Sequence, residues 1–579
     1  MRRTNILVGH DALVMMREPH FQDEWSALAT KDPRITIYQE PGFCLAWFAA
    51  TPPDEQAVLL TQRHEVSGEL IGLLVLSWNS NTRTIQHAGA HQTIYDGWIA
   101  EPDYSNDFIS DCIEIVFEHF QLRDWTWRYL PPGSPTEWAI RDRPECAPWA
   151  SHISPYPLPR WNLADVKFFK RKANSKRLRN YANRYRKEGV LELKTVSDPA
   201  EIELMLSKLN DWVDFRQGAV HQTLPFRSDP TKLAFYRELA LNDSTTRMTA
   251  LMLDERPLAI QIDSVDDKNK SMSLCLHGYD PTEGQRSPGM ILLTLLAHEL
   301  KDSSFKFIDL TPGSKSWKDD FANEWHEGQR VELYSQYRSV AKNAGKRQLF
   351  RLAKTFLNQA GIEPSAAKSQ AQRLRNGLIH GRETIKELVT GAAGPRIFEL
   401  DISSSVSTIG PAPRVKQVDV ISALLELSDK MLTDEHSLLL FDALKRFERE
   451  ATCFAHADEI SDAPLTHLSW LHVPPLRSVA PPPHIDNGVS PLISNLCDWI
   501  DIDIEADAIL VVSYEQNLDC DPVTVITPAL NAVRAMGRDK LFIATSARHQ
   551  ATVRWLSARA TVIPIEGPIV SQDEKLLSQ

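Results

Sequence analysis

One stretch, residues 271–321, constrains the fold of this chain more than any other part of it. It begins with a short apolar run, passes through a polar turn with Gly and Pro, enters an apolar segment of helical length, and reaches a second short run that ends in Asp309. This order predicts a strand, a turn, a helix and a strand. Because the first amides of a helix have no partner within it, the sequence predicts a phosphate-sized anion site where the turn meets the helix.

The length of the chain, 579 residues, is too great for one hydrophobic core and suggests about three or four domains. An apolar fraction of 42% and a charged fraction of 24% are typical of folded globular proteins. The net charge of −12 argues against a surface built throughout for nucleic acid. The seven cysteines are scattered and never form CxxC, so they predict neither a disulfide framework nor a zinc knuckle and favour a reducing cytoplasm.

No segment has the pattern of a membrane span or a signal peptide. The most apolar windows, residues 70–78 and 290–296, are far shorter than the roughly 20 residues of a spanning helix. Near the N-terminus, Asn5, His10 and Asp11 interrupt the apolar run that a signal peptide needs. We therefore expect a cytoplasmic protein.

The first 160 residues read as an α+β or α/β domain. Residues 56–61 and 70–78 are strand-like runs joined by a polar turn, residues 107–120 have helical spacing, and residues 125–130 read as another strand. The Pro-rich segment 147–159 that follows is interpreted as a linker.

The same layout then occurs twice more. A strand at 191–196, helices at 199–216 and 232–241 and a hairpin of residues 247–253 and 258–265 precede the opening stretch. Near the C-terminus, a helix at 437–450 and a hairpin precede strands at 508–513, 540–544 and 560–565, with helices at 523–536 and 549–557. We therefore predict domains at residues 1–160, 161–345 and 391–579, with a basic helical linker at 346–390.

A strongly basic segment, residues 167–187, holds ten Lys or Arg with Phe, Leu and Tyr between them. In one interpretation it is a solvated helix whose aromatic face packs on its own domain. In the other it binds a polyanion, which can be the phosphates of a coenzyme, an anionic polymer or a membrane surface. Both interpretations remain open at this point.

Several short segments in a fixed order carry a family resemblance. These are LRNYANRYRKEG, FYRELAL, PLAIQ, HGYDPTEGQRSPGMILL and FIDLTPGSKSWKDDF. Together they resemble the GNAT acyl-CoA N-acyltransferase superfamily. Within it, residues 40–345 resemble tandem-GNAT acetyltransferases of the CelD-like type, associated with cellulose biosynthesis and related to the Fem peptidyltransferases. The resemblance implies repeated α/β (α+β) folds with mixed central sheets flanked by helices.

The resemblance also implies a function and a coenzyme site. Acetyl-CoA or another acyl-CoA would be the co-substrate, and an amine or hydroxyl acceptor would receive the acyl group, with envelope or exopolysaccharide metabolism as context. The coenzyme pyrophosphate would lie against the turn and helix start, with glycines for close approach and an arginine for charge. The matching residues are Gly284, Gln285, Arg286, Ser287, Pro288, Gly289 and Met290. Without that context the SPG sequence is a plain helix start.

The candidate catalytic residues lie at the ends of the fourth and fifth strands of the implied fold. His277, Tyr279 and Asp280 close the fourth strand, beside the expected thioester, where acyl transfer needs proton removal and stabilisation of the leaving thiolate. Asp309 ends the fifth strand, and Lys318 follows it. The structural alternatives are a turn for Asp280, a packed strand position for His277 and an ion pair for Asp309 with Lys318.

Arg216, Gln261 and Trp317 are candidates for the acceptor pocket, and no metal site is expected. Most of the catalysis would come from positioning the acceptor and from an oxyanion contact to a strand amide.

The first and third domains depart from the coenzyme-binding pattern. The helix expected in the first domain begins with Asn106 and Asp107, and a helix start that carries Asp107 and Asp111 would repel phosphate. In the third domain, residues 516–522 contain two carboxylates and no glycine where the coenzyme loop would be. We expect neither domain to bind coenzyme. Two alternative functions remain open, a Fem-like transferase that uses aminoacyl-tRNA and a non-catalytic scaffold of degenerate GNAT domains.

Overall fold

The computed structural model of this protein describes most of the first 336 residues and parts of the remainder. The described ranges are 4–32, 34–139, 149–173, 175–313, 316–336, 395–401, 419–427, 434–448, 451–456, 467–472, 508–515, 523–536, 540–546, 550–558 and 560–563. The chain divides into two compact units. The first holds residues 1–213, 225–280 and 286–353, and the second holds residues 214–224, 281–285 and 354–579.

The first half of unit 1 forms an antiparallel sheet with flanking helices. Its sheet has the order β1-β2-β3-β4, with β5 also paired to β3. The central strand β3 is buried along nearly its whole length, which its apolar sequence LIGLLVLSWN explains. The predicted hairpin, helix and strand are confirmed. The elements are β1 (Asn5–Val8), α1 (His10–Arg17), α2 (Pro19–Lys31), α3 (Pro41–Ala50), β2 (Glu55–Arg63), β3 (Leu70–Asn79), β4 (Thr84–His87), β5 (Ile99–Ala100), α4 (Ser105–Phe120) and β6 (Asp124–Leu130).

The second half of unit 1 contains the strand, helix and strand predicted for residues 271–321. The turn between the first strand and the helix, residues 281–285, is grouped with unit 2, as are residues 214–221 at the end of the long helix α7 (Pro199–His221). The predicted basic helix is two helices, α5 and α6, and α7 extends five residues beyond its predicted end at 216. The elements are β7 (Ala150–Asn162), α5 (Val166–Ala173), α6 (Lys176–Glu188), β8 (Leu191–Val196), α7 (Pro199–His221), α8 (Pro230–Asn242), β9 (Thr246–Leu253), β10 (Arg256–Asp266), β11 (Ser271–Tyr279), η6 (Pro281–Arg286), α9 (Pro288–Asp302), β12 (Phe307–Asp309), α10 (Ser316–Phe321) and β13 (Glu324–Tyr334).

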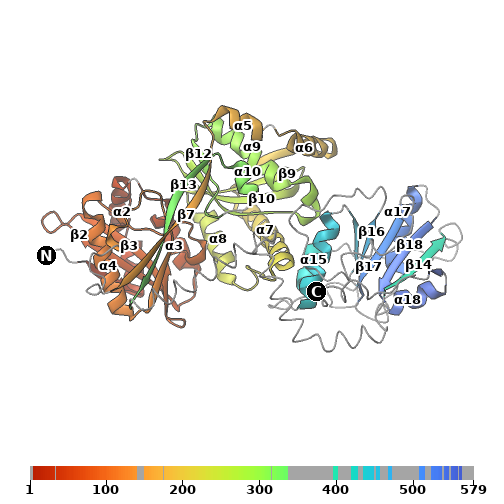
Figure 1. Ribbon diagram of the computed structural model, residues 1–579, viewed down its shortest axis with the longest axis horizontal. Helices are drawn as coiled ribbons and strands as arrows, with labels where there is room; N and C mark the ends of the chain where they lie inside the picture. The colour runs from red at the N-terminus through yellow and green to blue at the C-terminus, as the bar shows by residue number, and fades with distance from the viewer. Residues whose placement is uncertain are drawn as a thin grey trace, which may run out of the picture. The chain divides into compact units, whose positions relative to one another are not determined.

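The two halves of unit 1 share one sheet, in the order β6-β13-β7-β12-β11-β10-β9-β8. The last strand, β13, pairs with β7 along its full length and also with β6 of the first half. Val331 and Leu333 of β13 are therefore buried in the core of the first half with Trp125 and Trp127. Figure 1 shows β7 and β13 side by side where the two halves meet.

Our interpretation of residues 147–159 as a linker is wrong, because β7 begins at Ala150. Its prolines stand at alternate positions, so their nitrogens face the same side of the strand. The carbonyl of Pro159 accepts a hydrogen bond from the amide of Leu310 next to β12, so this side faces away from β13. Since β12 pairs with β7 only from Arg160 to Asn162, the missing proline N–H groups break no ladder.

Helices cover both faces of the second-half sheet. Figure 1 shows α5 and α9 on one side of β9 and β10, and α7 and α8 on the other. The apolar residues of α9 pack with Phe169 of α5 and with Leu178 and Tyr185 of α6. On the other side, a Cβ atom at Gly278 would lie 2.7 Å from the Leu209 Cδ1 atom, so this glycine lets α7 approach the end of β11.

Unit 2 repeats the strand order of the second half of unit 1. Its sheet has the order β15-β16-β17-β18-β14-β19, which corresponds strand by strand to β9-β10-β11-β12-β7-β13. Among the described strands of unit 2, β17 and β18 form the one parallel pair, which matches β11 with β12. The elements are β14 (Pro395–Asp401), α14 (Val420–Glu426), α15 (Asp434–Glu448), β15 (Thr452–His456), β16 (His467–His472), β17 (Ala508–Glu515), α17 (Val523–Ala535), β18 (Lys540–Ser546), α18 (Gln550–Ser557) and β19 (Thr561–Ile563).

The protein is thus an α/β protein of repeated mixed sheets, as the sequence predicted. The predicted linker 346–390 and the carboxylate-containing loop 516–522 lie outside the described residues. Within the described ranges, every helix is too short or too polar to cross a bilayer.

Candidate functional site

The parallel strands β11 and β12 separate at the centre of the second-half sheet. They pair only from Ser271 with Phe307 to Ser273 with Asp309. β12 ends there, whereas β11 continues along β10 to Tyr279. Beyond Ser273, the edge of β11 that faces away from β10 has no strand beside it among the described residues, and its amides can bond a ligand placed between the strand ends.

The helix that follows this opening, α9, begins at Pro288 after a short 3-10 turn. Gly284 and Gln285 lie in η6, Arg286 ends it, and Pro288 is the first residue of α9. Ser287 holds the N-cap position in the left-handed region, with φ 52°, and its side chain makes no capping hydrogen bond. The Ser287 carbonyl instead accepts hydrogen bonds from the amides of Met290, at 3.0 Å, and Ile291, at 3.2 Å.

Gly289 has no packing reason to be a glycine. A Cβ atom at this position would meet only the Tyr279 Cδ1 atom, at 3.5 Å, which is an ordinary van der Waals distance. The first turn of α9 is therefore open on this side. A glycine here favours close approach of a ligand to the backbone.

Arg286 is held by α6. Its guanidinium lies 2.8 Å from both carboxylate oxygens of Glu188 and 5.1 Å from the centre of the Tyr185 ring. The Arg286 side chain is 30% exposed and that of Glu188 is 44% exposed. Because exposed ion pairs contribute little free energy, a phosphate at the start of α9 can compete with Glu188 for this arginine.

Asp309, at the end of β12, is buried against a residue of the first half. It accepts a hydrogen bond from the Tyr95 hydroxyl at 2.5 Å and one from the Thr311 amide at 2.8 Å. Burial raises the pKa of Asp309, although the Tyr95 hydrogen bond and the charge of Arg160 oppose this rise. Burial and the Asp309 charge together raise the pKa of Tyr95 well above its ordinary value.

Lys318 holds the same loop from the other side. The residue is buried, and its Nζ atom donates to the Thr311 hydroxyl at 2.9 Å, the Thr311 carbonyl at 3.0 Å and the Pro312 carbonyl at 3.2 Å. Thr311 has a positive φ of 67°, which is costly for a β-branched residue. Asp309 and Lys318 are thus linked through Thr311, and together they fix the loop after β12.

The other predicted catalytic residues occupy two places. The His277 side chain is exposed at the end of β11, and its ring meets that of Trp317 on α10 at 5.6 Å. Tyr279 packs partly against the α9 core. Asp280 ends the strand, with its amide bonded to Leu258 and its carboxylate 3.5 Å from Arg256. His277 and Trp317 therefore lie together near the end of β11, while Asp280 is held toward β10.

Two predicted acceptor residues lie on elements other than β11 and β12. On β10, Gln261 stands directly opposite His277. Gln261 is buried, and its amide nitrogen lies 2.8 Å from both oxygens of Asp263, whose pKa is raised by burial to about 8. Its donor capacity is committed to that carboxylate. Arg216 is an exposed residue of α7 and belongs to the other compact unit.

Sequence reasoning missed Tyr95, Thr311 and Arg160. Tyr95 is separated from Asp309 by 214 positions in the chain. No periodicity or motif connects residues so distant, because the contact depends on the shared sheet. The positive φ of Thr311 has no sequence counterpart either, since glycine is the usual residue there.

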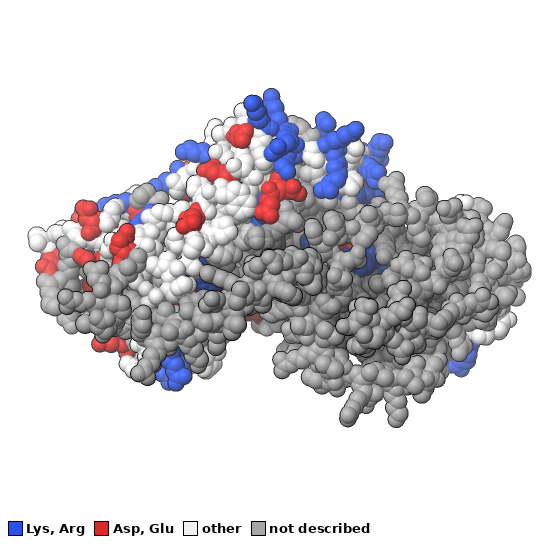
Figure 2. Space-filling model, in the orientation of Figure 1, with Lys and Arg blue, Asp and Glu red and all other residues white. Residues whose placement is uncertain are grey.

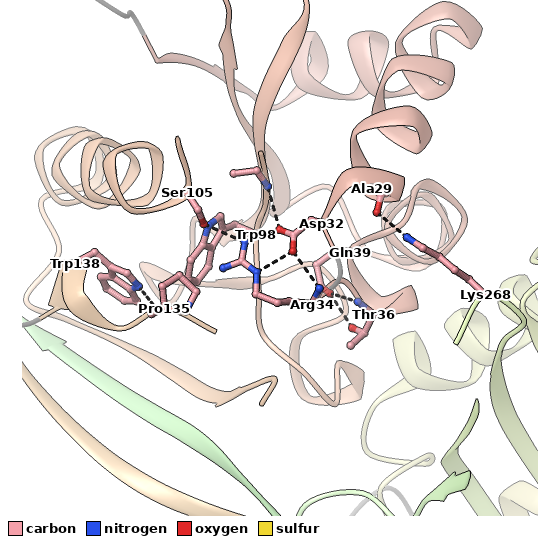
Figure 3. Close-up of polar contacts among 11 residues, drawn as sticks. Ala29, Asp32, Arg34, Thr36, Gln39, Trp98, Ser105, Pro135, Trp138 and Lys268 are labelled. Atoms are coloured by element: carbon pink, nitrogen blue, oxygen red, sulfur yellow. Dashed lines mark hydrogen bonds and ion pairs between the residues drawn. The ribbon is translucent and has the colours of Figure 1, made fainter. Parts of the chain in front are cut away.

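The corresponding helix start in the first half is already occupied by protein groups (Figure 3). The Ser105 hydroxyl, at the start of α4, accepts hydrogen bonds from Arg34 at 3.1 Å and from the Trp98 indole at 2.9 Å. Arg34 is itself held by Asp32 through Nε at 2.8 Å and an η nitrogen at 2.6 Å. A phosphate would have to displace this network and face Asp107 in the first turn.

The first half also fills the place between its strands with its own chain. The Asp96 amide bonds the carbonyl of Tyr129 on β6 at 3.0 Å. Arg128 of β6 donates to the carbonyls of Ala90 and Thr93. Both features support our prediction that this half does not bind coenzyme.

The basic segment forms a cationic surface, here called the α5–α6 face. Figure 2 shows Lys and Arg gathered over α5 and α6. Phe169, Leu178 and Tyr185 are buried in the core, as expected for a solvated helix with a packed apolar face. Among the described residues, only Lys172 of this surface pairs with a carboxylate, that of Asp320 at 3.4 Å. The exposed cations are Lys167, Lys170, Arg171, Lys176, Arg177, Arg179, Arg184, Arg186 and Lys187.

Over the ranges that the structure describes, no group of three or more His, Cys, Asp or Glu side chains is arranged to hold a metal ion.

Comparison with known proteins identifies the central domain. Residues 172–319 match the family of acetyltransferase (GNAT) domains. The chain therefore contains a GNAT acetyltransferase domain, and this family implies an acyl-CoA co-substrate. No curated protein matches the chain.

Several solved structures are similar to this chain over more than half of its length. FemX has 9% identity over 55% of this chain and 97% of its own, with a TM-score of 0.39. A tandem GNAT protein from the clavulanic acid biosynthesis pathway has 10% identity over 58% and 99%, with a TM-score of 0.35. A conserved protein of unknown function from Bacteroides thetaiotaomicron has 12% identity over 54% and 97%, with a TM-score of 0.37.

Proposed function

We propose that the domain at residues 161–345 transfers an acetyl or other acyl group from acyl-CoA to an amine, or to a hydroxyl, of an acceptor. The observation that carries this proposal is the separation of β11 from β12 directly before the open N-terminus of α9. An extended thioester needs strand amides on one side, and its pyrophosphate needs helix amides nearby. The match of residues 172–319 to the GNAT family supports it.

The pyrophosphate in this proposal lies against Ser287, Pro288, Gly289 and Met290, after the turn that contains Gly284 and Gln285. The absent Cβ atom of Gly289 admits it, and Arg286 exchanges Glu188 for a phosphate oxygen. The thioester lies along β11 beyond Ser273.

The reaction forms a bond from the acceptor nitrogen to the acyl carbon and breaks the carbon–sulfur bond, so the amine loses a proton and coenzyme A leaves as the thiol. A β11 amide stabilises the oxyanion of the tetrahedral intermediate. His277, exposed at the end of β11, receives the proton from the amine, and Tyr279 lies near the leaving sulfur. Asp309 and Lys318 act by fixing the loop after β12, and Trp317 forms a wall for the acceptor.

The acceptor context follows from the finer resemblance to CelD-like proteins, which remains a prediction. An envelope or exopolysaccharide precursor would supply amine or hydroxyl groups on a sugar. The α5–α6 face adds a surface suited to an anionic polymer. Gln261 would have to act on such an acceptor indirectly, since its amide donates to Asp263, and a role for Arg216 remains a prediction.

Calorimetry with acetyl-CoA tests the proposal. The wild type binds, and Gly289→Asp, which places a carboxylate at the pyrophosphate position, loses binding. Asn106→Asp, which adds the same charge to the first turn of α4, is the matched control and keeps wild-type affinity. Unchanged binding in Gly289→Asp would refute the site, and no binding by the wild type would favour the non-catalytic scaffold. Mass spectrometry of ligand carried through purification provides an independent readout.

The α5–α6 face also favours a second candidate, a transferase of the Fem-like kind that takes its acyl group from aminoacyl-tRNA. Nine exposed cations without carboxylate partners among the described residues can follow an RNA backbone. Transfer that requires charged tRNA and falls steeply with salt would select this candidate over acyl-CoA.

A further inference from the structure

We propose that Arg160 of β7 binds an anionic group, a phosphate or a carboxylate, of the acceptor. Arg160 stands directly opposite Asp309 on β12 and opposite Glu324 on β13. Directly opposite residues of antiparallel strands project from the same face of a sheet. Arg160 therefore shares a face with Asp309, and its charge acts on both Asp309 and Tyr95.

The Arg160 guanidinium has no hydrogen-bond or ion-pair partner among the described residues. Its Nε atom is buried and lacks a partner. The two carboxylates of its row are engaged by other groups. Asp309 accepts from Tyr95, and Glu324 accepts from Asn162 at 3.1 Å and lies 2.6 Å from His326. A partly buried arginine whose Nε–H group has no acceptor costs folding free energy unless a ligand supplies that acceptor.

The orientation of this guanidinium is fixed in advance. Arg160 lies over the Phe307 ring, with the guanidinium carbon 4.4 Å from the ring centre. Because only Nε is both buried and unbonded, the η nitrogens reach solvent-accessible space. A planar guanidinium that stacks on an aromatic ring and exposes its η nitrogens is suited to bidentate binding of an oxyanion.

The position of Arg160 also gives the span of the ligand. β7, β12 and β11 are neighbours in the sheet, and adjacent strands lie roughly 5 Å apart, so the Arg160 backbone is about 10 Å from that of Ser273. The thioester of the proposed function begins there. An acceptor that carries its anionic group about 5–10 Å from its amine would reach both places. The position of the acceptor amine in this inference rests on the proposed function. The contact between Arg160 and an anionic group does not depend on it.

Titration calorimetry with matched amines tests this contact on the full chain, with and without saturating coenzyme A. Glucosamine 6-phosphate is compared with glucosamine, and lysine with cadaverine, so the two pairs separate phosphate from carboxylate binding. The wild type prefers the anionic member of at least one pair by roughly 10-fold to 100-fold, the usual contribution of hydrogen bonds to a charged group. Arg160→Gln abolishes this preference, and Arg160→Lys retains only part of it.

Arg184→Gln is the control, because Arg184 also lies over an aromatic ring, that of Tyr181, but is located on the α5–α6 face. It keeps the wild-type preference. The absence of any preference in the wild type, its persistence in Arg160→Gln, or an equal loss in Arg184→Gln would each overturn the proposal. Melting temperatures separate weakened binding from unfolding, and Arg160→Lys decides the case if Arg160→Gln does not fold. The experiment without coenzyme A remains informative even if acyl-CoA binding fails.

Discussion

Tyr95 of the first half donates its hydroxyl to Asp309 of the second half, at 2.5 Å, in a buried contact. The first half of unit 1 thus completes the surroundings of the strand end where we place the acceptor. Because β13 belongs to the second half yet packs in the core of the first, the two halves cannot separate without breaking the shared sheet. The contact therefore has a fixed geometry.

Tyr95→Phe removes this hydrogen bond and should lower the free energy of unfolding by about 1–3 kcal/mol at neutral pH. The folded pKa of Asp309 is already raised by burial, and removing the donor raises it further. A carboxyl whose pKa is higher in the folded state loses stability as pH rises through the range between the unfolded and folded pKa values. The deficit of the variant should therefore be larger at about pH 8 than at about pH 4. Urea unfolding of the wild type and the variant at both pH values measures this deficit. An equal deficit at both pH values would contradict a Tyr95 hydrogen bond that stabilises the ionised Asp309 carboxylate.

The sequence predicted the local parts of this site and failed on the distant ones. The order of β11, α9 and β12 follows from neighbouring residues, whose apolar periods and turn chemistry are local properties. The contact of Tyr95 with Asp309 and the pairing of β6 with β13 join segments about 200 positions apart, and no local pattern encodes them. The prolines of β7 predicted a loop, because local rules do not show that their side of the strand needs no donors.

Gly289→Ala should separate stability from binding. Its Cβ atom meets only Tyr279, at 3.5 Å, so the helix accepts it, and the loss of glycine freedom in the unfolded chain stabilises the fold by about 0.4–1 kcal/mol. The same methyl group stands between the α9 amides and a pyrophosphate, so acetyl-CoA affinity should fall. Thermal unfolding and calorimetry on one preparation give both values. A variant that binds acetyl-CoA like the wild type would show that the coenzyme does not approach this turn.

Asp263→Asn should change how stability depends on pH. The Asp263 carboxyl has a folded pKa raised to about 8, against an ordinary value of 3.8, so its ionisation costs stability progressively between about pH 4 and pH 8. The slope approaches about 1.4 kcal/mol per pH unit for one proton. The variant has no such ionisation, so its stability relative to the wild type should increase with pH across that window. Asp266→Asn, an exchange at the end of the same strand, is the control. A constant difference between variant and wild type would show that Asp263 does not titrate there.

The α5–α6 face should bind polyanions without contributing to the fold. The triple variant Lys176→Ala, Arg177→Ala and Arg179→Ala removes three exposed cations that have no carboxylate partner in the described part of the chain, so the free energy of unfolding should change by less than about 1 kcal/mol. Binding of fluorescent heparin and of tRNA should weaken. The slope of log affinity against log salt should become shallower, in the case of tRNA by about 0.7–0.9 for each phosphate that the variant no longer neutralises. The control is Arg123→Ala, which removes an exposed cation of the first half. It should leave the binding of heparin and of tRNA, and its salt dependence, unchanged.

The two probes also distinguish the partners of this face. Because Phe169, Leu178 and Tyr185 are committed to the core, the α5–α6 face lacks an apolar stripe that could enter a bilayer, and its binding should be electrostatic and reversible by salt. A preference for tRNA over heparin at equal salt supports the aminoacyl-tRNA candidate, whereas equal binding supports an anionic polymer beside an acyl-CoA enzyme. Salt-resistant binding, or full binding by the triple variant, would place the polyanion elsewhere on the molecule.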